Sequence, residues 1–141
     1  MSLRRPQKTL AKEGSISGLG VHTGEEATVF FKPAPAGTGI RFLKDGEGVT
    51  IGEAPEISRR TAVGGADRRI HTVEHLLAAL HGLEITNLIV DVHGPEVPIL
   101  DGSAEPFVRL FKSLGILDQP QKTDVYAVRE PIFCHEGSSI L

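Results

Sequence analysis

The chain has 141 residues, a length that suits one domain with an ordinary hydrophobic core. Its formal net charge of −3 argues against general nucleic-acid binding, and a single cysteine, Cys134, excludes an internal disulfide and a cysteine-rich zinc site. No apolar run approaches the ~20 residues of a membrane-spanning helix and residues 1–13 lack the apolar core of a secretory signal, so we expect a cytoplasmic protein.

The first third of the chain predicts short strands separated by turns. Glu13-Gly14 and Asp45-Gly46 are turn-forming pairs, and Pro33 ends an apolar run. Three glycines within residues 18–24 indicate a backbone that bends sharply or comes close to another group. The apolar segments between these breaks predict strands at 9–11, 15–17, 28–32 and 39–43.

Residues 72–82 predict a short α-helix that is buried along one side. Thr72 is a good N-cap, and Gly82 is typical of the position just after a helix end. The apolar side chains recur with helical spacing, at Val73, Leu76, Leu77, Leu80 and Leu83. We therefore expect a helix of about three turns with one face toward a core.

Three titratable side chains crowd the start of this helix. His71 and His75 lie four residues apart, which places them on one helical face, and Glu74 directly precedes His75. Neutral imidazoles at a helix N-terminus are suited to bind a metal ion. Three interpretations remain open: a solvated helix end with two surface histidines, an inverzincin-type H-x-x-E-H protease site, or a pair in which Glu74 is a base and only His75 a ligand.

The second half of the chain predicts a central strand, a second helix and one or two final strands. The apolar run at 87–93 is typical of a buried strand, and segments 125–128 and 132–134 predict the final ones. Helical spacing is found at Phe107, Leu110, Phe111 and Leu114, with Ser103 or Asp101 as the cap and Gly115 as the end. Because strands and helices do not alternate strictly, we expect an α+β fold, a two-layer sandwich of a mostly antiparallel sheet with two helices on one face.

Four stretches of the chain, in order and with matching spacing, resemble one enzyme family. They are residues 18–24 (GLGVHTG), 32–42 (KPAPAGTGIRF), 72–76 (TVEHL) and 98–103 (PILDGS). Together they closely resemble the N-terminal domain of UDP-3-O-acyl-N-acetylglucosamine deacetylase, the zinc enzyme of lipid A biosynthesis. The resemblance implies two similar α+β domains with the active site between them, and hydrolysis of the 2-acetamide of a UDP-linked acylated amino sugar.

The resemblance implies a role for each member of the Glu74-His75 pair. Glu74 would be the base that activates water, and His75 would be one ligand of a Zn²⁺ cofactor. This fits the chemistry, because zinc lowers the pKa of a bound water to about 7 and a neighbouring carboxylate can accept its proton. The resemblance gives His71 no ligand role, which leaves the inverzincin interpretation with little support.

Other positions match the family's substrate pocket less directly. His22 lies in the glycine-rich bend and matches a position near the pocket, although a turn histidine without function fits almost as well. Thr61 and Ala62 fall where the family's pocket-lining loop lies. For Asp101 we favour a structural role as a cap of the second helix that also satisfies buried amides. A solvated basic loop, rather than a diphosphate site, is the interpretation we favour for Arg59, Arg60, Arg68 and Arg69.

The family's other zinc ligands come from a His-Lys-x-x-Asp type segment in a second domain, and this chain contains no such segment. Because a catalytic zinc site needs three protein ligands, residues 1–141 are expected to form a single domain that resembles the N-terminal half of the enzyme and is inactive alone. Its partner would be the missing C-terminal domain, or a second copy bound through the exposed face. The alternative is a non-catalytic binding module of the same fold.

Overall fold

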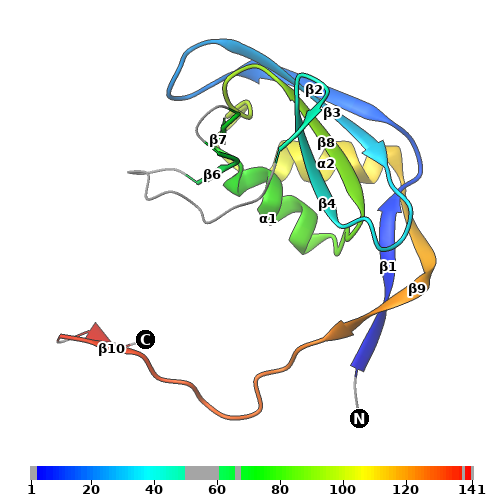
Figure 1. Ribbon diagram of the computed structural model, residues 1–141, viewed down its shortest axis with the longest axis vertical. Coiled ribbons are helices and arrows are strands. Elements are labelled where there is room, and N and C mark those ends of the chain that lie inside the picture. The colour runs from blue at the N-terminus through cyan, green and yellow to red at the C-terminus, as the bar shows by residue number, and fades with distance from the viewer. Residues whose placement is uncertain (1–2, 50–60, 66–67, 138, 141) are drawn as a thin grey trace.

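The computed structural model describes residues 3–49, 61–65, 68–137 and 139–140. Figure 1 shows a compact body and, below it, a C-terminal segment that runs away from that body. The elements, in chain order, are β1 Leu3–Leu10, β2 Gly14–Leu19, β3 Glu26–Pro33, β4 Ile40–Lys44, β5 Glu47–Gly48, β6 Ala62–Val63, β7 Ile70–His71, α1 Glu74–Gly82, β8 Leu88–His93, α2 Glu105–Leu114, β9 Ile116–Val125, β10 His135–Glu136 and β11 Ser139–Ile140.

A five-stranded sheet in the order β2-β3-β8-β4-β5 forms one layer of the body. Strand β8 lies in its centre, antiparallel to β3 and parallel to β4, as its apolar run predicts. Side chains alternate along β3, where Val29 and Phe31 are fully buried while Phe30 between them is exposed. The alternation directs one face of the sheet to the core.

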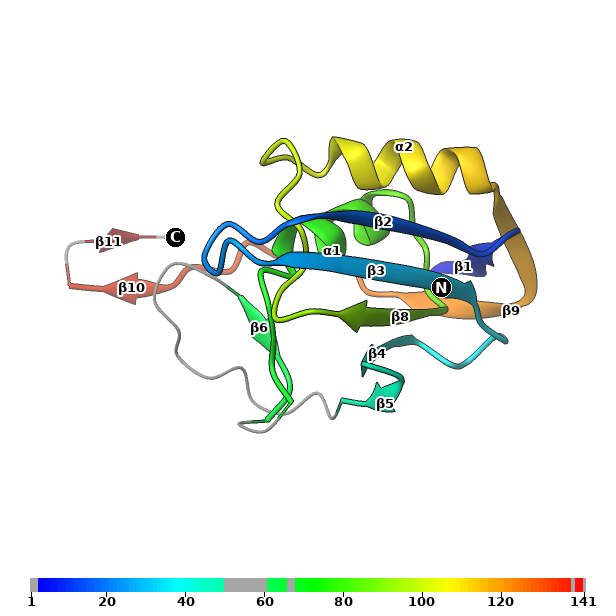
Figure 2. The ribbon, with the colours of Figure 1, turned by 90° about the horizontal axis from the view of Figure 1, so that it is seen from above.

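Both helices cover that inner face, which confirms the predicted α+β sandwich. Figure 2 shows α1 behind the strands and α2 along the β2 edge. The Phe31 ring of β3 meets the Phe111 ring of α2 edge to face, with centroids 4.9 Å apart. Leu76 and Leu80 of α1 join the same buried cluster. Neither helix is long and apolar enough, within the described part of the chain, to cross a membrane.

Both ends of α1 differ from the prediction. Thr72 is not its N-cap: the helix begins at Glu74, Thr72 has a φ of 61°, and its hydroxyl donates to the buried carboxylate of Glu96. Gly82 is the last helical residue, and the left-handed residue is Glu84, with a φ of 56°. The Ile85 N–H donates to the Leu80 carbonyl at 2.9 Å and the Glu84 N–H to that of His81 at 3.0 Å, so a Schellman motif ends the helix.

The N-cap of α2 is Ala104, which makes no side-chain cap bond, so the predicted caps Ser103 and Asp101 act from one and three positions further back. The Ser103 hydroxyl accepts the Glu105 N–H at 3.1 Å, and the Asp101 carboxylate accepts the Ser103 N–H and hydroxyl at 2.9 and 2.8 Å. Asp101 thus stabilises the cap indirectly, and because it is exposed it does not satisfy buried amides as we expected. Gly115, with a φ of 84°, follows the helix as predicted.

Strands β1 and β9, which lie far apart in the sequence, pair as an antiparallel two-stranded ribbon. Leu10 pairs with Ile116 and Leu3 with Val125, so β1 does not pair with β2 across the Glu13-Gly14 turn. The predicted strands at 125–128 and 132–134 are wrong: β9 ends at Val125, and the segment after it forms no strand until His135. Its large apolar side chains face solvent, with Tyr126 97% exposed, so they lack the packing that would hold a strand.

Candidate active site at the start of α1

Glu74 and His75 are the first two residues of α1, and both side chains are half-buried rather than turned into the core. The Glu74 Oε2 accepts the backbone N–H of Thr61 at 3.3 Å. The Nδ1 atom of His75 is buried and has no hydrogen-bond partner among the described residues. A carboxylate and an imidazole nitrogen with bonding capacity to spare therefore belong to consecutive residues at the positive end of a helix.

Thr61 contacts Glu74 through its backbone, and Ala62 follows it in β6. Ala62 of β6 pairs with His71 of β7, and the Thr61 carbonyl accepts the Thr72 N–H at 2.8 Å. Figure 1 shows β6 and β7 directly before α1. Thr61 is exposed whereas Ala62 is buried, so only Thr61 presents its side chain to solvent. Contact of either residue with a substrate remains a prediction.

The structure contradicts the shared helical face of His71 and His75. His71 ends strand β7, and Thr72, with its left-handed φ, separates that strand from α1. The two histidines are therefore not one turn apart on a helix. An inverzincin site requires that helical spacing, so the geometry removes this interpretation.

The loop that carries His22 is attached to the same region through Glu96, a residue that sequence reasoning missed. Glu96 is fully buried. Its Oε1 accepts the N–H of His22 at 2.9 Å and both the N–H and the hydroxyl of Thr23 at 2.8 Å, while its Oε2 accepts the Thr72 hydroxyl at 2.7 Å. The only available signal was an acidic residue between Pro95 and Pro98, just after the central strand.

Two opposing effects set the charge state of Glu96. Burial raises its pKa, but the hydrogen bonds from Thr72, from the backbone and side chain of Thr23, and from the backbone of His22 lower it. The net effect holds the pKa of Glu96 below its ordinary value. Because hydrogen bonds to a carboxylate favour its charged form, Glu96 is an anion at neutral pH.

The described residues do not by themselves form a complete metal site. In the ranges that the structure describes, no three His, Cys, Asp or Glu side chains are grouped closely enough to hold a metal ion. His75, with its unpartnered buried nitrogen, suits the role of one zinc ligand. A catalytic zinc site needs three protein ligands, so the other two would have to come from outside these residues.

The two described arginines of the basic loop differ: Arg68 is paired at the surface, whereas the buried Arg69 Nε has no hydrogen-bond partner among the described residues. Arg59 and Arg60 lie outside the described residues. Arg68 is exposed and forms an ion pair with Glu47, and Arg69 follows it immediately before β7. An exposed, paired arginine fits the favoured interpretation of a solvated basic loop.

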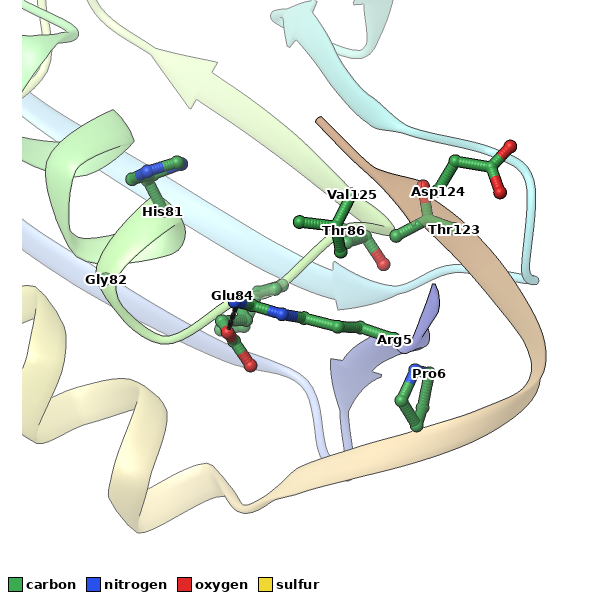
Figure 3. Close-up of a pocket in the computed structure, with 10 residues that line it drawn as sticks. Arg5, Pro6, His81, Gly82, Glu84, Thr86, Thr123, Asp124 and Val125 are labelled. Carbon is green, nitrogen blue, oxygen red and sulfur yellow. Dashed lines mark hydrogen bonds and ion pairs between the residues drawn. The ribbon is translucent and has the colours of Figure 1, made fainter. Parts of the chain in front are cut away.

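A pocket of about 450 Å³ lies at the other end of α1 and is separate from this site. Figure 3 shows His81 on one side of it and the β1–β9 ribbon on the other, with the Arg5 side chain reaching Glu84. The Glu84 carboxylate pairs with both Arg5 and Lys8, so its charge is already compensated. None of the residues that line this pocket is a predicted catalytic, metal-binding or substrate-binding residue.

Comparison with known proteins identifies the family. The model of the UDP-3-O-acyl N-acetylglycosamine deacetylase (LpxC) family matches residues 7–141. The chain belongs to this family. It is 41% identical over 139 residues to the bifunctional enzyme LpxC/FabZ of Chlorobaculum tepidum. The aligned region covers 92% of this chain and 29% of that protein.

Two further members are named UDP-3-O-acyl-N-acetylglucosamine deacetylase. The protein from Bdellovibrio bacteriovorus is 39% identical over 93% of this chain and 45% of its own length. The protein from Aquifex aeolicus is 40% identical over 96% of this chain and 48% of its own length. The chain therefore spans about half or less of the length of the curated relatives that it matches.

Proposed function

We propose that this chain is the N-terminal part of a zinc-dependent deacetylase that removes acetate from UDP-3-O-acyl-N-acetylglucosamine in lipid A biosynthesis, and that it is inactive alone. The observation that carries the proposal is the Glu74-His75 pair at the open start of α1 in a chain of this family. The names of the relatives support the substrate. A nucleotide-linked substrate also supports a cytoplasmic location.

In this proposal Glu74 is the general base and then the general acid. The Thr61 N–H bonds to its Oε2 and fixes the carboxylate at the first turn of α1. From that position the carboxylate takes a proton from the attacking water and returns it to the leaving amine. Both transfers need a carboxylate that is not enclosed in the core, and Glu74 is only half-buried.

His75 would be one of the three protein ligands of Zn²⁺, with the other two from the remaining part of the protein. When bound, zinc supplies a lowered pKa for water and polarises the amide carbonyl. Its unpartnered Nδ1 shows that the ring is not committed to the described protein at that atom. The chain alone should bind zinc weakly, and tight one-to-one binding in a titration would contradict the ligand count.

The exposed apolar side chains after β9 support the proposal that further polypeptide packs against this segment in the intact protein. Tyr126, Val128, Ile132 and Phe133 are 97, 76, 79 and 68% exposed, and four large apolar side chains so close in sequence are costly to leave in water. We propose that the remaining polypeptide of the intact protein covers them. Purified residues 1–141 should self-associate through this segment, as measured by analytical ultracentrifugation. Addition of the C-terminal part of the enzyme should reduce this self-association, because both would compete for the same apolar side chains.

The deciding experiment restores the missing half. Chain 1–141 is mixed with, or fused to, the C-terminal part of the Aquifex aeolicus relative, and acetate release from UDP-3-O-acyl-N-acetylglucosamine is measured with zinc present. We expect activity with the wild-type chain and a loss of at least ~100-fold with Glu74→Ala. The matched control is His81→Ala, which changes an exposed side chain at the other end of α1. Activity that survives Glu74→Ala would exclude Glu74 as the base.

A further inference from the structure

A single buried carboxylate connects the segments that carry the predicted site residues. Glu96 accepts four hydrogen bonds, three from the His22-Thr23 loop and one from Thr72. Thr72 lies two residues before Glu74, and its N–H bonds to the carbonyl of Thr61, whose own N–H bonds to the Glu74 carboxylate. The loop and the first turn of α1 are therefore tied through one side chain.

The backbone around Glu96 fixes where this carboxylate lies. Glu96 forms a parallel bridge with His71, and the Val97 N–H donates to the His71 carbonyl at 3.0 Å. On the other side, Gly20 leaves the space that the side chain fills, because a methyl group at Gly20 would overlap the carboxylate. The side chain is thus enclosed between the glycine-rich bend and β7.

The energetics favour a specific role over simple packing. A buried carboxylate is costly unless its lone pairs are satisfied, and the described residues offer Glu96 no cationic partner within ion-pair distance. Its four donors include the backbone N–H groups of His22 and Thr23. Backbone bonds of this kind set the path of the loop, and so the place from which the His22 side chain starts.

We propose that Glu96 is a positioning residue of the deacetylase reaction: its carboxylate holds the loop that carries His22 at a fixed place relative to the helix turn that carries Glu74 and His75. This inference rests on the proposed function and adds to it a residue, Glu96, that acts only by positioning other residues. Glu96 itself touches neither substrate nor metal in this proposal. Loss of its charge loosens the loop and misplaces His22 without unfolding the body.

The first test measures how firmly Glu96 holds the His22-Thr23 loop, and it does not depend on enzyme activity. Amide hydrogen exchange is followed by NMR in chain 1–141 for the wild type, for Glu96→Gln and for the matched control Val97→Ala. Gln keeps the size of the side chain but weakens charge-assisted bonds, so the His22 and Thr23 amides should exchange about tenfold faster. Val97→Ala trims a fully buried side chain next to Glu96 and should lower overall stability without selective change at these two amides.

The second test measures the consequence for catalysis in the restored enzyme. A misplaced His22 should lower kcat about tenfold in Glu96→Gln, whereas Val97→Ala should keep the wild-type kcat at a temperature where both variants are folded. Glu96→Asp, which keeps the charge but is one methylene shorter, should recover part of the protection at Thr23.

The outcomes separate this inference from the proposed function. Unchanged exchange at His22 and Thr23 in Glu96→Gln, or equal acceleration in Val97→Ala, overturns the positioning role even if the enzyme deacetylates. Equal kcat for Glu96→Gln and the wild type overturns it as well. Selective exchange in a restored protein that releases no acetate would instead refute the proposed function and leave the tie between the segments in place.

Discussion

The two ends of α1 hold a carboxylate in opposite ways. Near its start, Glu96 is fully buried and accepts four hydrogen bonds from uncharged donors. At its end, Glu84 is partly exposed and pairs with two cations, Arg5 and Lys8. Both arrangements lower the pKa of the carboxyl, the first by hydrogen bonds against the cost of burial, the second by the Lys8 hydrogen bond and the Arg5 charge.

The comparison teaches that two carboxylates whose pKa shifts in the same direction can differ in how much they contribute to folding stability. Water competes for every partner of Glu84, so that carboxylate can be replaced with little loss. Glu96 is itself fully buried, and its removal would leave the buried hydroxyl of Thr72 without an acceptor, while the His22 and Thr23 donors lie nearer the surface. The geometry at the start of α1 is therefore fixed, whereas the geometry at its end is adaptable.

The largest expected effect is on folding stability in Glu96→Ala. Removal of the carboxylate leaves the buried Thr72 hydroxyl without an acceptor and opens a cavity, so the free energy of unfolding should fall by about 3 kcal/mol. Urea denaturation followed by circular dichroism measures this change, with Glu84→Ala as the control at the other end of the helix. If Glu96→Ala lowered the free energy of unfolding no more than Glu84→Ala does, the proposed difference between the two carboxylates would be wrong.

A smaller loss is expected when the space for Glu96 is filled from the opposite side. Gly20→Ala should cost about 2 kcal/mol, because the added methyl overlaps a carboxylate that its hydrogen bonds hold in place. Gly48→Ala is the matched control, since a Cβ there meets no atom within 4 Å. Equal melting temperatures for the two variants would show that the Glu96 side chain can move aside freely.

The pH dependence of stability should isolate Glu96. Because its folded-state pKa lies below the ordinary value of 4.5, the folded protein binds this proton less readily than the unfolded chain. Its contribution is therefore complete above the ordinary pKa and is lost as the pH falls through the folded value. The difference in melting temperature between the wild type and Glu96→Gln should shrink from about pH 7 to about pH 3, and a constant difference would argue against an ionised Glu96.

The smallest effect is expected for Glu84→Gln. The Glu84 side chain is 41% exposed and its Arg5 partner 57% exposed, so both ions are well solvated when apart. The melting temperature should change little at low salt and not at all at high salt, because dissolved ions screen exposed pairs. A large, salt-independent loss would mean that the two ends of α1 are less different than their burial indicates.

Much of the fold follows from local patterns in the sequence. The apolar spacing of α2, the uninterrupted run of β8 and the Asp45-Gly46 turn each predict their element because the signal lies within a few residues. The β1–β9 ribbon could not be predicted in this way, since the pairing of Leu10 with Ile116 depends on the rest of the body. Tyr126 to Phe133 misled the prediction because apolar composition favours a strand only where a partner exists.

The candidate site shows the same division. Glu74 and His75 were found from a short motif and its resemblance to a family, and the structure places them together at a helix start. Thr72 was predicted as an N-cap because its type suits that role, but the Glu96 carboxylate, distant in sequence, takes its hydroxyl instead. A lone glutamate in a loop has no spacing pattern, so only the folded arrangement reveals what Glu96 does.

The β1–β9 ribbon has a consequence for the order in which the chain can assemble. On a ribosome the first strand emerges early and cannot find its partner until Ile116 and the residues after it have been made. Closing such a long loop is slow in comparison with forming α1 or the β2–β3 pair. During that delay the strand edge of β1 that later faces β9 stays unpaired.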